Sequence, residues 1–245
     1  MPKLILISGP SCIGKSPLVK GIGTLCPKVA ETLETLVLTT DRLRRPGEED
    51  GKAYHFRTRK ELEKLRKDKG HVVVDNRGDL HALELAAIDR IHATGRHALY
   101  EGNPRMPAAL REAGVLDRYD TCSVFLSPLS RDEVRAAQEA GLDIEALVTD
   151  IQRRKLLHRA TRQEGILSRP DLDDIETRAT SAYGELREAW RYDVVVPLHD
   201  GEGHDNWSRF GLPIGSARAA IRTVAALISG RHTDGKEYWE ADLLQ

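Results

Sequence analysis

Residues 9–16 constrain the fold of this chain more than any other segment. They match the pattern G-x-x-x-x-G-K-[ST] in full and read Gly9-Pro10-Ser11-Cys12-Ile13-Gly14-Lys15-Ser16. An apolar run at 4–7 precedes the pattern, and an apolar helical pattern begins near residue 18. A buried strand, a glycine-rich turn and a helix therefore follow one another, which predicts a phosphate-binding loop on an open α/β sheet.

Each residue type in this loop has a physical task. Gly9 and Gly14 let backbone N–H groups converge on an anion at a helix N-terminus. Lys15 would reach the β- and γ-phosphates of a nucleoside triphosphate, and the Ser16 hydroxyl would complete the coordination of a bridging Mg²⁺. Pro17 suits a first helical turn, where its missing N–H has no intrahelical partner. We therefore expect residues 9–17 to bind the nucleotide.

Composition favours one domain with a nucleotide-sized partner. With 245 residues, 40% hydrophobic and 31% charged, the chain can bury a single substantial core. The net charge of −1 gives no global basic field, which argues against long nucleic acid or an anionic membrane as partner. No apolar stretch approaches the roughly 20 residues of a membrane span, and the three cysteines form no CxxC pair. We expect a cytoplasmic protein with reduced thiols.

Short apolar runs alternate with helical patterns, as in an open parallel sheet flanked by helices. The expected strands cover residues 4–7, 36–39, 72–75, 98–101, 123–126 and 193–196. The expected helices cover residues 17–25, 59–68, 80–93, 106–113, 131–140, 143–163, 172–189 and 216–229. Two polar segments, 40–59 and 130–174, are interpreted as insertions into this α/β core.

The segment 39–56 carries chemistry for a second anion. Three arginines precede a turn and a tyrosine follows it, at Arg42, Arg44, Arg45 and Tyr54. Arginine forks bind phosphate oxygens bidentately, and a tyrosine hydroxyl can donate to the same group. The segment therefore predicts a site for a phosphate monoester, apart from the triphosphate.

The order of these motifs resembles the guanylate kinase family. The loop at 9–16, Thr39-Thr40 before the arginines, Pro46-Gly47-Glu48, Asp50-Gly51 and Tyr54-His55-Phe56 occur in the family's order and at nearly its spacing. A looser likeness continues through 99–102, 125–130 and 192–196. The resemblance implies a P-loop NTPase-type fold that moves a phosphoryl group from ATP, with Mg²⁺, to a nucleoside monophosphate, GMP or dGMP above all.

The resemblance also implies how the chain is organised. We expect a single domain over residues 1–245, with a core at about 1–36, 76–128 and 181–230. The acceptor-binding region would cover about 37–75, and a lid with an extended connection would cover about 129–180. The family's phosphate-gripping positions fall on Arg42, Arg45 and Tyr54, with Arg44 as an alternative because of one extra residue before Pro46.

Recognition of the base depends on a carboxylate, which can accept from guanine N1–H and the exocyclic amine. Alignment on Gly78 puts Val72 where the family has its main glutamate and His81 where it has a tyrosine. Asp75 and Asp79 are the carboxylates nearby, and Glu101 matches the family's aspartate on the next strand. We expect Asp75 and Glu101 to orient the acceptor or the metal.

Basic residues of the predicted helix 143–163 are candidates for closing over the transferring phosphoryl group. Ala140 occupies the position where the family pattern has an arginine, shortly before this helix. The helix itself carries Arg153, Arg154, Arg159 and Arg162. With Lys15, we favour Arg154 and Arg162 as catalytic, since a supplied arginine stabilises charge on the equatorial oxygens. The alternative is a solvated helix face paired with acidic neighbours.

Other interpretations stay open at this stage. The acceptor could be another nucleotide or a small phosphorylated molecule, or the chain could be a binding module of the same fold that recognises a phosphorylated partner without catalysis. The segment 199–205 is interpreted as a turn-rich loop, with adenine contact, an interface or a metal as its alternatives. A homo-oligomer is compatible with the sequence.

Overall fold

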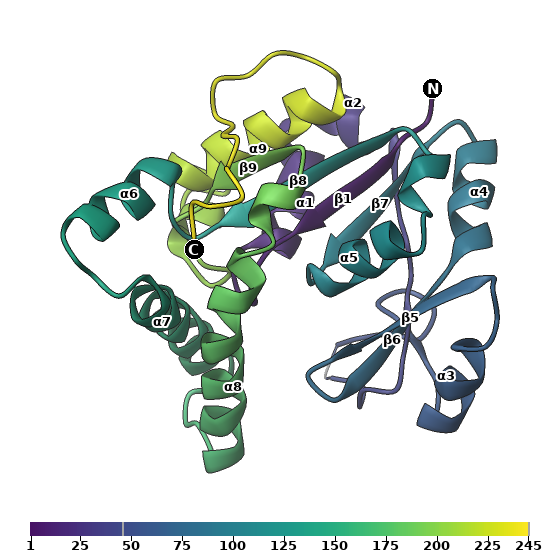
Figure 1. Cartoon of the computed structure of the whole chain (residues 1–245), viewed down its shortest axis with the longest axis horizontal. Coiled ribbons are helices and arrows are strands. Elements are labelled where there is room, and N and C mark those ends of the chain that lie inside the picture. Colours follow the sequence, from purple (N-terminus) through teal and green to yellow (C-terminus); the bar gives the residue numbers. More distant parts are fainter. Residues whose placement is uncertain (46, 245) are drawn as a thin grey trace. The chain divides into compact units, whose positions relative to one another are not determined.

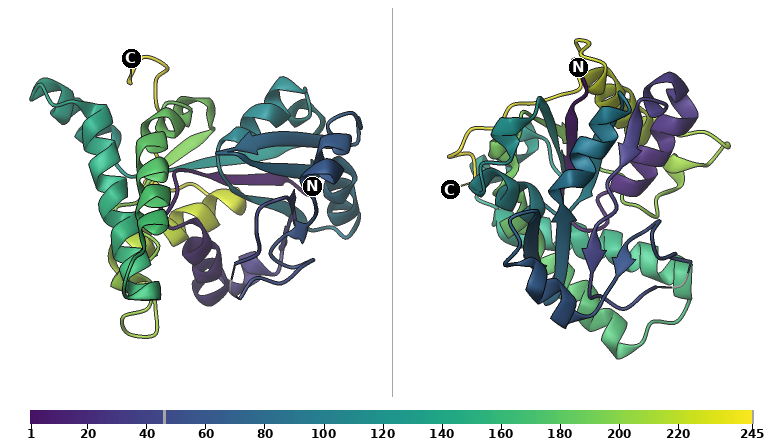
Figure 2. Two further views of the ribbon diagram at one scale, coloured as in Figure 1. Left: turned by 90° about the horizontal axis from the view of Figure 1, so that it is seen from below. Right: turned by 90° about the vertical axis from the view of Figure 1, so that its right-hand side faces the viewer.

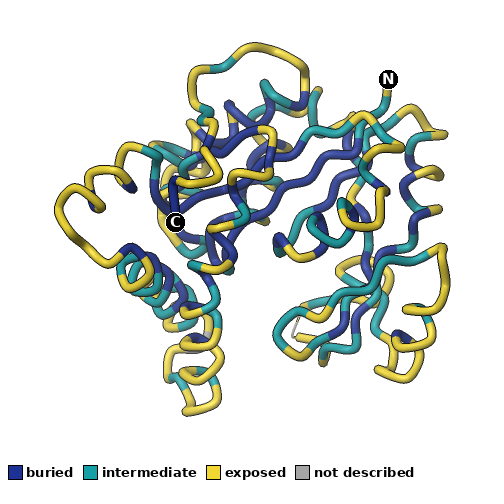
Figure 3. Tube along the Cα trace, viewed as in Figure 1, coloured by how far each residue is buried: buried dark blue, intermediate teal, exposed yellow. Residues whose placement is uncertain are grey.

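The computed structural model describes residues 1–45 and 47–244, with Glu164 described by its backbone alone. Pro46, part of the Pro-Gly-Glu motif, lies outside the described residues. A five-stranded parallel sheet has the order β2-β7-β1-β8-β9 and is flanked by helices (Figure 1). Buried residues follow its strands (Figure 3), because apolar runs such as Leu4–Ser8 are enclosed on both faces.

Strands and helices alternate along most of the chain. The strands are β1 (Leu4–Ser8), β2 (Leu33–Thr35), β3 (Thr39–Thr40), β4 (His55–Phe56), β5 (His71–Asn76), β6 (Asp79–Glu84), β7 (His97–Gly102), β8 (Thr121–Ser127) and β9 (Val194–Pro197). The α-helices are α1 (Lys15–Leu25), α2 (Pro27–Ala30), α3 (Arg59–Leu65), α4 (Leu85–Ala93), α5 (Arg105–Glu112), α6 (Arg131–Glu139), α7 (Ile144–Glu164), α8 (Arg169–Leu186) and α9 (Gly215–Ile228). Short 3-10 turns lie at Leu116–Arg118, Ala189–Arg191 and Asp205–Trp207.

The chain divides into two compact units. The first unit comprises Met1–Leu6 and Thr32–Thr121, and the second comprises Ile7–Glu31 and Cys122–Gln245. Within the first unit, a four-stranded sheet has the order β4-β3-β6-β5, in which β5 and β6 form an antiparallel hairpin. This smaller sheet extends to Glu84, beyond the expected acceptor-binding region at about 37–75.

The second unit contains the phosphate-binding loop and its helical surroundings. Helix α1 packs against α9, and α7 packs along α8 (Figure 2). Ser168 and Asp171 form a capping box at the start of α8, while Asp143 caps α7. Residues near the C-terminus complete the core of this unit, since Trp239 and Leu243 are buried within it.

The structure corrects three of the expected elements. Residues 80–84 form strand β6 rather than the start of a helix, and α4 begins only at Leu85. The run 72–75 belongs to the antiparallel hairpin rather than to a parallel sheet. The run 36–39 is not one strand, because β2 ends at Thr35 and β3 begins at Thr39. In the described part of the chain, no helix combines the length and apolar character needed to cross a membrane.

A tight turn at Arg77 and Gly78 explains why the residues that follow it form strand β6. Asn76 and Asp79 pair across a tight turn in which Arg77 has φ 58° and Gly78 has φ 90°. Positive φ at both central residues is the geometry of a two-residue hairpin turn that matches strand twist. Beyond this turn, Leu80 and Leu83 pack into different apolar clusters, as residues on opposite faces of a strand do.

Candidate active site

The loop after β1 has a backbone that only glycine allows at two positions. Gly9 has φ 153° and Gly14 has φ 104°. A Cβ at Gly9 would lie 2.5 Å from the carbonyl oxygen of Leu126, and a Cβ at Gly14 would lie 2.6 Å from the Trp207 ring. The two glycines therefore leave room for a tight cradle of backbone N–H groups at the start of α1.

The Lys15 side chain folds back over the loop. Its Nζ donates to the carbonyl oxygens of Gly9, at 2.9 Å, and Pro10, at 2.8 Å. The ammonium group is thus folded over the same loop whose N–H groups form the cradle. Ser16 follows on the first turn of α1, at the N-terminus of that helix.

Cys12 joins the loop to two other segments of the second unit. The residue is buried, and burial raises the pKa of its thiol. Its Sγ lies 3.4 Å from the carbonyl oxygen of Lys155 in α7, and its own carbonyl oxygen accepts from the Glu202 N–H at 3.0 Å. The side chain therefore contributes to packing, and α7 lies directly against the loop.

One face of α7 presents basic side chains to this region. Lys155 donates to the carbonyl oxygen of Leu198 at 3.1 Å, and burial lowers the pKa of Lys155 to about 8. Arg159, whose side chain is 20% exposed, donates to Glu202 at 2.7 Å. Glu202 also donates its backbone N–H to Cys12, so Arg159 is linked to the loop through Glu202. Lys155 is linked to the loop through the contact of its carbonyl oxygen with Cys12.

The two arginines of α7 that the sequence analysis favours as catalytic have other partners than Lys155 and Arg159. Arg154 is 79% exposed and pairs with Asp150 one turn earlier, at 2.8 Å. Arg162 donates to the Gly203 carbonyl oxygen at 3.2 Å and to the Asp205 carboxylate. Sequence reasoning missed Lys155, although its spacing from positions 159 and 162 puts all three on one helix face.

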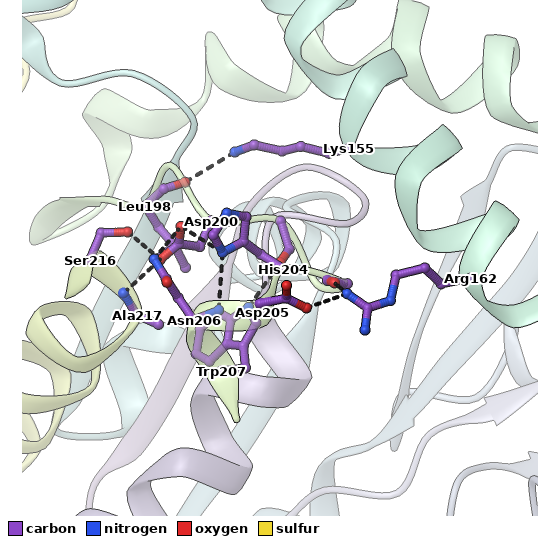
Figure 4. A network of polar contacts seen from close by, with 12 residues as sticks. Lys155, Arg162, Leu198, Asp200, His204, Asp205, Asn206, Trp207, Ser216 and Ala217 are labelled. Atoms are coloured by element: carbon purple, nitrogen blue, oxygen red, sulfur yellow. Dashed lines mark hydrogen bonds and ion pairs between the residues drawn. The ribbon is translucent and has the colours of Figure 1, made fainter. Parts of the chain in front are cut away.

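The loop at 198–207 is built around a buried carboxylate (Figure 4). Asp200, which is 6% exposed, accepts from the Ala217 N–H at 2.9 Å and from the Asn206 amide at 3.1 Å. Ser216 donates to the same carboxylate, and the Trp207 indole N–H donates to the Gly201 carbonyl oxygen at 2.8 Å. These bonds fix the loop onto the start of α9. Nowhere in residues 1–45 and 47–244 do three or more His, Cys, Asp or Glu gather as metal ligands.

In the first unit, the structure brings Arg42 and Tyr54 together. The Arg42 guanidinium lies over the Tyr54 ring, 5.3 Å from its centroid, and bonds to the Glu48 carboxylate at 2.7 Å. Glu48 also accepts from the Arg45 N–H at 2.9 Å. Burial raises the pKa of the Tyr54 hydroxyl. The arginine segment is thus ordered around Glu48, whose place on Arg42 an acceptor phosphate could take.

Of the two carboxylates expected to orient the acceptor or the metal, Glu101 lies near the cluster of Arg42 and Tyr54, whereas Asp75 contacts the hairpin turn. Glu101 lies at the end of β7, close enough for its charge to act on Tyr54. Asp75 is exposed, and its carboxylate accepts from the Gly78 N–H at 2.9 Å and lies 3.9 Å from Arg59. Asp75 therefore stabilises the hairpin turn.

Comparisons with known proteins agree with this geometry. A model of the guanylate kinase family matches residues 1–182. A guanylate kinase of Mesorhizobium japonicum is 28% identical over 198 residues, covering 80% of this chain and 76% of the relative. That of Nitratidesulfovibrio vulgaris is 30% identical over 79% of this chain and 88% of its own length. The crystal structure of guanylate kinase from Anaplasma phagocytophilum has the same fold, with a TM-score of 0.55 at 16% identity over 96% of this chain and 89% of the other.

Proposed function

The chain belongs to the guanylate kinase family, and we propose that it transfers the γ-phosphoryl group of ATP to GMP or dGMP. The products would be ADP and GDP or dGDP. The loop at 9–16 carries this proposal, because Gly9 and Gly14 have no room for a Cβ and the Lys15 ammonium folds over the loop, an arrangement that would suit a polyphosphate. The cluster of Arg42 and Tyr54 would provide a separate site for the acceptor phosphate.

The chain would act by positioning and by electrostatics. On binding ATP, Lys15 would leave the loop carbonyls and contact the β- and γ-phosphates. Arg159 would exchange the Glu202 carboxylate for a phosphate oxygen as charge develops on the transferring group, while Lys155 adds a fixed positive charge beside the loop. The acceptor oxygen attacks the γ-phosphorus, and the bond to the ADP oxygen breaks.

The loop also suits Mg²⁺ bound together with the nucleotide. Ser16 offers a hydroxyl oxygen at the start of α1, and Mg²⁺ is commonly held by one or two protein oxygens, waters and phosphates. When bound, the ion neutralises charge on the β- and γ-phosphates. The acceptor phosphate would be held by Arg42 after release from Glu48, with Arg45 and Tyr54 beside it.

Transfer of label tests the proposal directly. The protein is incubated with ATP labelled at the γ-phosphate and with GMP, and the nucleotides are separated. We expect label in GDP, and a loss of about 100-fold or more in rate with Lys15→Ala. Label only in inorganic phosphate, or ATP binding without any transfer, would contradict the proposal and favour a binding module.

A further inference from the structure

The β5–β6 hairpin presents a set of polar side chains on one face. Cross-strand partners in an antiparallel pair project to the same side of the sheet. His81 pairs with Val74 in β5 and with Thr40 in β3, and Asp79 pairs with Asn76. Because side chains alternate along a strand, Asp79 and His81 share a face, whereas Asp75 lies on the opposite one.

This face adjoins the predicted phosphate grip. The His81 ring packs edge-on against Tyr54, with centroids 5.6 Å apart. Burial and the nearby Arg42 lower the pKa of His81 to about 4, so the imidazole is neutral near pH 7. Asp79 lies two residues before His81, at the start of β6, which is about 7 Å away in an extended strand. The charges of Arg42 and Arg45 also reach Asp79.

Asp79 and Asn76 carry hydrogen-bonding capacity that the hairpin does not use. Within the described ranges, no side chain or backbone N–H donates to the Asp79 carboxylate. Burial, together with Asp41, raises the pKa of Asp79. Asn76 has a buried Oδ1 without a hydrogen-bond partner. A partly desolvated carboxylate and an unsatisfied amide side by side favour a ligand that donates hydrogen bonds.

Two other positions of the hairpin, Asp75 and Val72, do not supply a carboxylate that could contact a ligand on this face. Asp75 is engaged by Gly78 and Arg59 at the turn. Val72, at the position where the family resemblance places a glutamate, packs against an apolar cluster that includes Leu83. Asp79 is therefore the carboxylate of the hairpin that lies on the same face as His81, the face that packs against Tyr54.

We propose that Asp79 reads the guanine base of the acceptor, with Asn76 beside it and His81 as a positioning residue between Asp79 and Tyr54. The carboxylate would accept hydrogen bonds from guanine N1–H and from the exocyclic amine. Adenine presents an acceptor at N1, so the same carboxylate disfavours it. This inference rests on the proposed function and assigns the specificity of that same acceptor site.

The test compares GMP with IMP, which lacks the exocyclic amine. Asp79→Asn preserves the shape of the side chain but removes the charge and one acceptor. We expect KM for GMP to rise about 10- to 100-fold with kcat little changed, as for loss of binding felt equally in the ground and transition states. The rise for IMP should be smaller, so the preference for GMP falls. The matched control is Glu84→Gln, in the same strand but on the opposite face, where the side chain pairs with Arg90 at 2.7 Å. This variant should leave both KM values unchanged.

The outcomes separate this inference from the proposed function. If the wild-type protein phosphorylates GMP and Asp79→Asn retains its KM and its GMP preference, the inference is overturned and the proposed function stands. Equal losses in Asp79→Asn and Glu84→Gln also overturn it, because they indicate a general disturbance of the hairpin. If the wild-type protein does not phosphorylate GMP, both the proposed function and the reading of guanine fail.

Discussion

Replacing Lys155 by Met is expected to raise stability while lowering activity. The Lys155 ammonium is half-buried beside the Leu198 carbonyl oxygen, and this loss of solvent lowers its pKa from 10.5 to about 8. The folded protein therefore binds fewer protons than the unfolded chain between these values. The charge of Lys155 destabilises the fold at neutral pH, and this cost diminishes as pH rises from 8 towards 10.5.

The size of the effect follows from the same pKa. Linkage gives a cost of about 3 kcal/mol at pH 7 and about 1.5 kcal/mol at pH 9.5. Loss of the hydrogen bond to Leu198 opposes the gain by about 1 kcal/mol at either pH. Lys155→Met should therefore be about 2 kcal/mol more stable than wild type at pH 7, and nearly equal to it at pH 9.5.

Urea unfolding at the two pH values measures this difference, with Lys20→Met as control. Lys20 lies exposed on α1, and its replacement should alter the free energy of unfolding by about 0.5 kcal/mol or less at either pH. The same Lys155→Met protein should lose about 100-fold in kcat, because a fixed cation beside the phosphate-binding loop is gone. The inferred cost of this partly buried charge is wrong if Lys155→Met is less stable than wild type at pH 7, or if the difference in stability does not change with pH.

Further substitutions test other parts of the account. Gly14→Ala should abolish ATP binding in a titration and lower stability by about 2 kcal/mol or more, because its Cβ would meet Trp207 at φ 104°. Gly23→Ala, with open space around it, should instead stabilise α1 by up to about 1 kcal/mol, and equal effects would contradict the steric argument. Tyr54→Phe should raise KM for GMP about 10-fold in steady-state kinetics, and an unchanged KM would remove Tyr54 from the phosphate grip. Asp200→Ala should lower the free energy of unfolding by about 2 kcal/mol, because buried donors lose their acceptor, and unaltered denaturation would show that the loop at 198–207 is held otherwise.

Much of the fold and one part of the site could be predicted from local chemistry. The phosphate-binding loop depends on residues adjacent in sequence, so its strand, glycines and helix are readable in order. The residues that surround this loop in space cannot be predicted in the same way. The environment of Lys155, for example, arises from packing of α7 against segments more than 40 residues away in sequence. A buried lysine cannot be distinguished from a solvated one by spacing alone.

The hairpin illustrates a second limit. Strand β6 ends at Glu84 and α4 begins at Leu85, so no glycine or proline separates the two patterns and the sequence favours one helix. The choice between Asp75 and Asp79 depends on the hairpin register, which the turn at Arg77 and Gly78 sets. A shift of one residue in this register would pair Asp75 with Asp79 and put both carboxylates on the same face.

The selectivity among nucleoside monophosphates is the most direct test of whether the chain phosphorylates GMP or dGMP. ADP release is measured with GMP, dGMP, AMP, CMP, UMP and dTMP at matched concentrations, for the wild-type protein and for Lys15→Ala. The assignment as a GMP kinase requires fast turnover with GMP or dGMP, little with the other four, and none with Lys15→Ala. Turnover that favours another acceptor, or no turnover across the panel by a protein that binds ATP, would contradict it.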